Sequence, residues 1–99
     1  MNFLKTYPDL ITPWQIYIIQ CGDGTLYTGI TKNIKNRISL HNAGKGSKYT
    51  RGRRPVNLVY LEWAANQGSA LRREYEIKQL DSGEKQKLIT GWSVQNADR

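Results

Sequence analysis

A predicted β-hairpin near the N-terminus constrains this chain most. Residues 14–20 are rich in bulky apolar side chains, and a second strand over 25–30 follows the Gly-Asp-Gly segment 22–24. Side chains alternate across a strand, so Tyr17 and Tyr27 share a face only if the turn has an odd number of residues, as segment 22–24 does. A two-residue turn would place them on opposite faces. The turn therefore decides whether both phenols can serve one site.

Periodicity and end signals predict the remaining elements. We expect a helix over 33–43, a basic, glycine-rich loop over 44–55, a strand over 56–63, a helix over 68–80 and a short helix from 81 or 82 to about 91. Ser69 is the expected N-cap of the second helix, and Asp81 and Glu84 have capping-box spacing at the third. The order β-β-α-β-α-α predicts an α/β (α+β) domain whose small sheet is covered by helices.

The length of 99 residues predicts one domain. We place it at residues 14–92, after a loose leader over 1–13 and before a frayed tail over 93–99. Cys21 is the only cysteine, which excludes an intramolecular disulfide and a cysteine-based metal cluster. No segment approaches the ~20 apolar residues of a membrane span, so we expect a soluble, cytoplasmic protein with no membrane partner.

The positive charge is concentrated in one segment. The net charge is +7, yet residues 32–54 contain no acid and eight basic residues: Lys32, Lys35, Arg37, Lys45, Lys48, Arg51, Arg53 and Arg54. Outside this segment seven basic residues face eight acidic ones. A localised positive field of this kind favours a polyanionic partner, most often nucleic acid. The alternative is a solvated basic surface that only aids solubility.

Arg37 and His41 lie four residues apart on the first predicted helix. They therefore share one side of it, at the rim of the stripe that Ile34 and Ile38 bury. An arginine there can bind phosphate through its planar fork, and a histidine can exchange a proton near neutral pH. The alternative for His41 is a residue that only complements the helix dipole.

The second predicted helix carries two acids, Glu74 and Glu76. On a helical wheel Glu74 lies on the inward stripe beside Leu71 and Ile77, whereas Glu76 faces solvent. A carboxylate among apolar neighbours needs a cationic partner. That partner is either a hard cation such as Mg²⁺ or Arg37 in a buried ion pair.

These residues together resemble the GIY-YIG nuclease superfamily. Gln15-Ile16-Tyr17 and Tyr27-Thr28-Gly29 are similar to the two halves of its signature, with Gln15 in place of the first glycine. Three further residues fall where the superfamily places its arginine, its histidine or tyrosine, and its metal-binding glutamate: Arg37, His41 and Glu74. The resemblance covers residues 14–89, and segments 48–51 and 59–60 also resemble small stand-alone bacterial members.

The resemblance implies a three-stranded antiparallel sheet flanked by helices, and phosphodiester hydrolysis with one divalent cation, Mg²⁺ or Mn²⁺. Glu74 would hold the metal and Arg37 the phosphate, while Gly29 would form a structural turn. Tyr17, with Tyr27 or His41, would orient or deprotonate the attacking water. A free tyrosine has a pKa near ~10, so it is a poor base at pH 7, and a base at His41 needs less tuning. We favour Tyr17 with His41 as its partner and leave the reverse open.

The expected function is a metal-dependent endonuclease acting on DNA in preference to RNA. The cations Lys32, Lys35, Lys45, Lys48, Arg51, Arg53 and Arg54 would contact the backbone, with Tyr49 free to stack on a base. With no reader domain, specificity would come from nucleic-acid shape rather than sequence. The alternatives are a catalytically weak or inactive nucleic-acid-binding module and a protein-interaction domain. The sequence does not identify any protein that recruits this domain.

Overall fold

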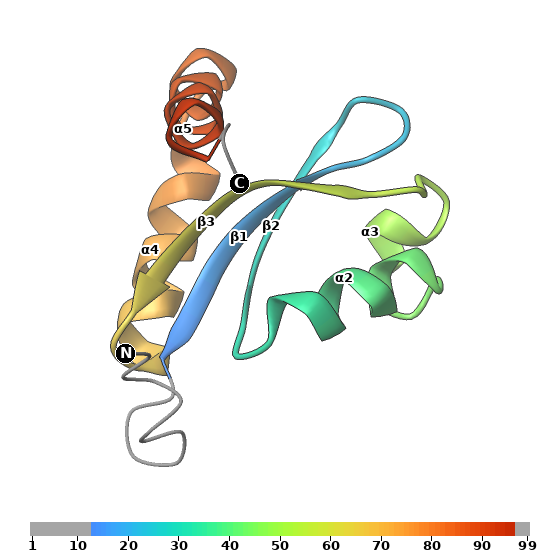
Figure 1. The fold of residues 1–99 in the computed structure, drawn as a ribbon, viewed down its shortest axis with the longest axis horizontal. Helices are drawn as coiled ribbons and strands as arrows, with labels where there is room; N and C mark the ends of the chain where they lie inside the picture. The colour runs from blue at the N-terminus through green and yellow to red at the C-terminus, as the bar shows by residue number, and fades with distance from the viewer. Residues whose placement is uncertain (1–12, 97–99) are drawn as a thin grey trace.

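A three-stranded antiparallel sheet lies between two layers of helices (Figure 1). The computed structural model describes residues 13–96, so the expected leader lies almost wholly outside the described residues, as does the end of the tail. The strands are β1 (Trp14–Gln20), β2 (Leu26–Thr31) and β3 (Asn57–Ala64), in the spatial order β2-β1-β3. The predicted sheet and the predicted element order are confirmed, with one additional short helix.

The hairpin has the register that the two tyrosines require. Tyr17 pairs with Gly29 and Ile19 pairs with Tyr27, so both phenols lie on the same face of the sheet. The Cys21 amide donates to the Thr25 carbonyl at 2.8 Å, which leaves residues 22–24 as the turn. Gly24 has a φ of +86°, a backbone conformation that glycine adopts without steric cost. The odd-numbered turn is confirmed.

Strand β1 is buried on both faces because helices cover each side. Ile16 and Ile18 pack against α4 (Gln67–Gln79) and α5 (Ser82–Gln95). Tyr17 and Ile19 face the opposite layer, where α2 (Ile34–Asn42) contributes its predicted apolar pair, Ile34 and Ile38. The apolar and tyrosine-bearing sides of β1 thus contact different helices.

Two helix boundaries differ from the predictions. Asn66, not Ser69, is the N-cap of α4, because its side chain accepts a hydrogen bond from the Ser69 amide at 2.8 Å. The capping box of Asp81 and Glu84 is confirmed at α5. That helix continues past its expected end at Gly91 to Gln95. A single glycine weakens a helix by about 1 kcal/mol but does not end it.

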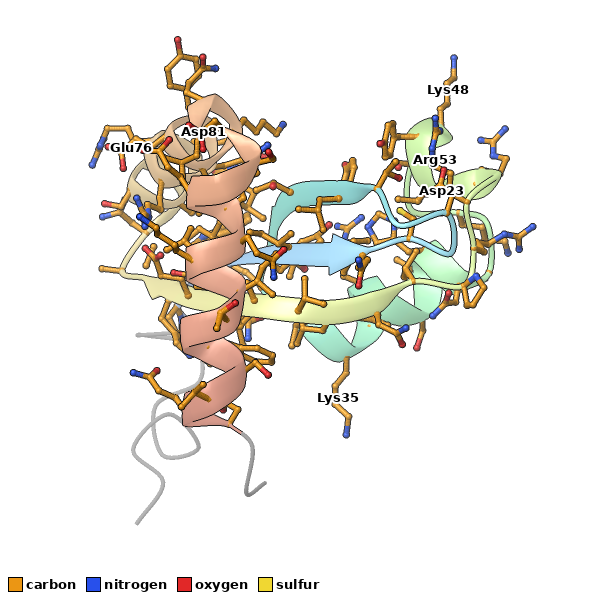
Figure 2. All side chains as sticks on the ribbon, turned by 90° about the horizontal axis from the view of Figure 1, so that it is seen from above. Asp23, Lys35, Lys48, Arg53, Glu76 and Asp81 are labelled. Carbon is orange, nitrogen blue, oxygen red and sulfur yellow. The ribbon has the colours of Figure 1, made fainter. Side chains whose placement is uncertain are left out.

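The basic loop holds a short helix, α3 (Lys48–Arg51), that the sequence did not predict. The hairpin turn anchors this loop: the Gly22 amide donates to the Arg53 carbonyl at 2.6 Å, and Asp23 pairs with Arg53 at 3.0 Å. Figure 2 shows Asp23 and Arg53 side by side below Lys48. Among residues 13–96, no helix is both long and apolar enough to span a membrane.

Candidate active site

Tyr17 and His41 form the centre of the candidate site. The Tyr17 hydroxyl lies 3.0 Å from His41 Nε2, and these side chains are only 2% and 0% exposed. The Tyr27 ring completes the cluster, with its centroid 6.4 Å from that of Tyr17 and 5.2 Å from that of His41. Three of the predicted site residues are therefore in one aromatic cluster on the α2 side of the sheet.

Gly29 makes room for the Tyr17 ring. A Cβ atom at Gly29 would lie 2.6 Å from the Tyr17 hydroxyl, closer than van der Waals contact permits. The prediction of a structural turn at Gly29 is wrong, because the residue lies within β2 and pairs with Tyr17. Its missing side chain lets the tyrosine reach across the neighbouring strand, so the signature glycine serves the site by its size.

The surroundings keep the central pair neutral near pH 7. Burial raises the pKa of Tyr17 well above its ordinary value; the neighbouring Tyr27 and Glu74 add to the shift, and Arg37 opposes it. Burial also lowers the pKa of His41, and the positive charge of Arg37 acts in the same direction.

Arg37 presents a donor without a protein acceptor. It lies on α2, one turn before His41, and its Nε is buried with no hydrogen-bond partner among the described residues. A buried guanidinium N–H without an acceptor is costly, and an anionic ligand can supply the missing partner. Arg37 is therefore suited to hold a phosphate oxygen.

Glu74 lies inward, as the wheel predicts. Its side chain is 19% exposed, against 63% for Glu76, and its Oε2 lies 3.4 Å from Lys78 Nζ. Within residues 13–96, Glu74 and Arg37 do not form the alternative ion pair. No cluster of three potential metal-ligating side chains occurs between residues 13 and 96. A lone carboxylate still fits Mg²⁺, which keeps several waters and completes its ligand set with substrate phosphates.

The side of His41 away from Tyr17 contacts a residue that the sequence did not single out. Thr50 on α3 is fully buried, and its Oγ1 lies 2.8 Å from His41 Nδ1. Gly46 packs against the imidazole so tightly that any side chain there would collide with it. Ser47 and Thr50 have the spacing of an N-cap and the amide that it binds. This spacing predicts a capped turn, but it does not predict the contact between Thr50 and His41.

A groove of about 230 Å³ lies beside the cluster and holds two unpredicted cations. Tyr27 and Tyr49 line it together with Lys78 and Lys85 from the far helices. The i,i+4 spacing of Lys78 from Glu74 was a signal that could have placed one of them here. Tyr49, 38% exposed, is not a free ring, because it stacks on Tyr27 and lies under the Arg53 guanidinium.

The predicted phosphate-contacting residues do not share one surface. Lys35 and Lys48 point to opposite sides of the molecule (Figure 2). Arg54 donates to the carbonyls of Arg51 and Asn42, while Lys32 lies over the Trp14 ring. Lys45, Lys48 and Arg51 are exposed. The cations of segment 32–54 are thus divided between structural contacts and open surface.

Gln15, which stands in place of the first signature glycine, positions the helix that carries Arg37 and His41. Its buried side chain accepts a hydrogen bond from the Ile34 amide at 3.1 Å, at the first residue of α2. This contact satisfies one of the amides that a helix N-terminus leaves without an internal partner.

Comparison with known proteins agrees with this arrangement. A family profile described as the GIY-YIG catalytic domain matches residues 13–87. A UPF0213 protein of Desulfotalea psychrophila is 56% identical over 77 residues, which cover 77% of this chain and 70% of the relative. A UPF0213 protein of Staphylococcus haemolyticus is 54% identical over 74 residues, covering 75% and 90%. The solution NMR structure of a UPF0213 protein from Bacillus halodurans is similar at 42% identity and a TM-score of 0.52, covering 79% of this chain and 83% of that one. The chain belongs to the GIY-YIG catalytic-domain family, among its small UPF0213 proteins.

Proposed function

We propose that this domain hydrolyses phosphodiester bonds in nucleic acid, with DNA as the preferred substrate. One observation carries the proposal: the buried Tyr17–His41 hydrogen bond lies one helical turn from Arg37, whose buried Nε has no acceptor among the described residues. An acid–base pair, a phosphate-binding cation and a metal-binding carboxylate are the groups that such a hydrolysis needs.

In the proposed reaction, Tyr17 and His41 move one proton between them. The Tyr17 oxygen takes a proton from the attacking water as its own proton passes to His41 Nε2, 3.0 Å away. The water oxygen bonds to phosphorus, the bond to the leaving oxygen breaks, and that oxygen takes a proton from solvent. Arg37 donates to the phosphate and offsets the charge that develops on it.

Glu74 is the residue that would hold a divalent cation, Mg²⁺ or Mn²⁺. When bound, the cation would polarise the phosphate and neutralise part of its charge. Lys78, which pairs with Glu74 here, is free to move to a substrate phosphate once a cation occupies the carboxylate. Glu74 is one ligand only, so we expect nucleic acid and metal to bind cooperatively.

The groove beside Tyr27 offers a path for the substrate strand. It joins the Glu74–Lys78 pair to Tyr49 and Lys85, and the exposed cations Lys48 and Arg51 continue the positive surface on α3. The cationic side chains suit contacts to the phosphate backbone rather than the reading of base edges. We therefore propose that branched or distorted DNA is preferred over any particular sequence.

The test is cleavage of supercoiled and branched DNA with Mg²⁺ or Mn²⁺. Wild-type protein should cut, whereas Glu74→Gln should lose at least the ~10–100-fold that removing a partner of a metal ligand costs. The matched control is Glu76→Gln on the same helix, whose side chain faces solvent and whose activity should be unchanged. Equal cleavage by wild type and Glu74→Gln contradicts the proposal.

A nucleic-acid-binding module without catalysis is the second candidate, favoured by the lack of any group of three potential metal ligands among residues 13–96. It predicts tight DNA binding and no cleavage with any divalent cation. Binding also has a salt signature: if about four cations contact phosphates, affinity falls on the order of a hundredfold from 50 to 200 mM salt. Cleavage separates the two candidates, whereas a flat salt response contradicts both.

A further inference from the structure

Thr50 is the only described residue besides Tyr17 that forms a hydrogen bond with the His41 ring. Its side chain is fully buried, and it is held on the one-turn helix α3 by Ser47. Ser47 Oγ accepts from the Thr50 amide at 3.1 Å and lies 3.0 Å from Thr50 Oγ1. A hydroxyl fixed in this way has little freedom to adapt to the histidine, so its bonding pattern constrains the ring.

Counting protons around Thr50 favours one state of His41. The Thr50 hydroxyl has one proton and two lone pairs, and three groups surround it: His41 Nδ1 at 2.8 Å, Ser47 Oγ at 3.0 Å and the Ser47 carbonyl at 3.4 Å. The carbonyl can only accept, and the Thr50 hydroxyl is its second donor beside the Arg51 amide at 3.2 Å, so this contact takes up the Thr50 proton. Ser47 Oγ and His41 Nδ1 must then both donate. All three contacts are made only when the proton of the neutral imidazole is on Nδ1.

The hydrogen bond between Tyr17 and His41 favours the same protonation state of His41. The hydroxyl of this buried phenol has one hydrogen-bond partner among the described residues, His41 Nε2. If Nε2 carried the proton, the phenol proton would have no acceptor there, and a buried donor without a partner costs ~1–3 kcal/mol. With the proton on Nδ1, Nε2 is free to accept from Tyr17.

We propose that Thr50 is a positioning residue that holds His41 in its Nδ1-protonated form and so directs Nε2 at the Tyr17 hydroxyl. The catalytic consequence rests on the proposed nuclease function, whereas the protonation state itself does not. The basic loop then has a second role, because the short helix that exposes Lys48 and Arg51 also carries Thr50 to the histidine.

The single histidine of the chain makes this state directly measurable. Long-range ¹H–¹⁵N NMR at pH 8 reports which imidazole nitrogen carries the proton, and only one histidine contributes signals. We expect protonated Nδ1 and unprotonated Nε2 in the wild type, and the same pattern in Thr50→Ser. In Thr50→Val the pattern should shift toward protonated Nε2. A wild-type spectrum with protonated Nε2 overturns the proposal, and so does an unchanged Thr50→Val spectrum.

Controls separate positioning from folding. Thr28→Val alters another buried threonine on a sheet strand and should leave the histidine spectrum unchanged. In the cleavage assay, Thr50→Val should lose on the order of ten- to a hundredfold in rate, and Thr50→Ser should restore most of it. If the wild type does not cleave, the nuclease function fails while the spectrum still decides the role of Thr50. If Thr50→Val does not fold, Thr50→Ala removes the same hydroxyl, and its spectrum is compared with that of the wild type in the same way.

Discussion

The two faces of β1 are built from alternate residues of one strand, yet they differ in kind. Ile16 and Ile18 enter an apolar cluster with α4 and α5. Tyr17, on the other face, enters a polar network with His41 and Thr50 that is just as well buried. The first face gains free energy from burial, whereas the second must satisfy every buried donor and acceptor. One strand thus serves stability on one side and chemistry on the other.

The largest expected effect is on the polar face. Tyr17→Phe keeps the ring and removes the hydroxyl, so cleavage should fall by about 10²–10⁴-fold, the size of a lost acid–base contribution. Because His41 Nε2 loses its partner, the free energy of unfolding should also fall by ~1–3 kcal/mol. Initial cleavage rates and urea unfolding measure the two effects. Normal cleavage by this variant would remove Tyr17 from the chemistry.

On the apolar face of β1 a substitution should lower stability but not cleavage. Ile18→Ala deletes apolar atoms from a fully buried position, so the free energy of unfolding should fall by ~2–5 kcal/mol. Cleavage per folded molecule should be unchanged, because Ile18 points away from the tyrosines. Urea unfolding gives the folded fraction by which rates are corrected. A corrected rate that fell as far as that of Tyr17→Phe would break the division between the faces.

Gly29→Ala tests the space for the Tyr17 ring. The added methyl would meet the phenol at 2.6 Å, so we expect a loss of ~1–3 kcal/mol from overpacking and reduced cleavage as the hydroxyl moves. Gly91→Ala is the matched control, because it is helical and has open space around its Cβ. It should stabilise the fold by up to ~1 kcal/mol. If both substitutions stabilise, Gly29 is not needed for its size.

The smallest effect is a pH dependence of stability. The pKa of folded His41 is depressed, so the unfolded chain binds a proton first, near its ordinary value of ~6.5. Stability is therefore complete above this pH and is lost as the pH falls from ~6.5 toward the folded pKa. Urea unfolding of wild type and His41→Gln between pH 7.5 and 5 should differ in slope. Parallel curves would show that His41 is not held neutral.

Local patterns predicted most of the fold. The alternation in β1, the Gly-Asp-Gly turn and the paired isoleucines of α2 each act over a few residues, and each prediction is confirmed. The spacing of Arg37 and His41 and the inward side of Glu74 were equally local. Thr50 and Lys85 could not be found this way. Their places depend on how the basic loop and α5 pack, which involves contacts distant in sequence.

Gly29 shows a different limit. Glycine favours turns, and this preference predicts a turn at Gly29. Its place in the strand instead reflects the volume of a tyrosine twelve residues earlier in the chain. Propensity describes a residue alone, whereas this position is determined by its cross-strand partner.

The Gly-Asp-Gly turn has a consequence for protein engineering. Its length sets the register of both tyrosines, and its Gly22 and Asp23 also fasten the loop that carries Thr50. A one-residue insertion in the turn would thus disturb both the register of the tyrosines and the position of the loop that carries Thr50. Grafting this site onto another scaffold therefore requires the turn and the basic loop to be transferred together. A different hairpin turn would change the register of the tyrosines and remove the contacts that hold the loop.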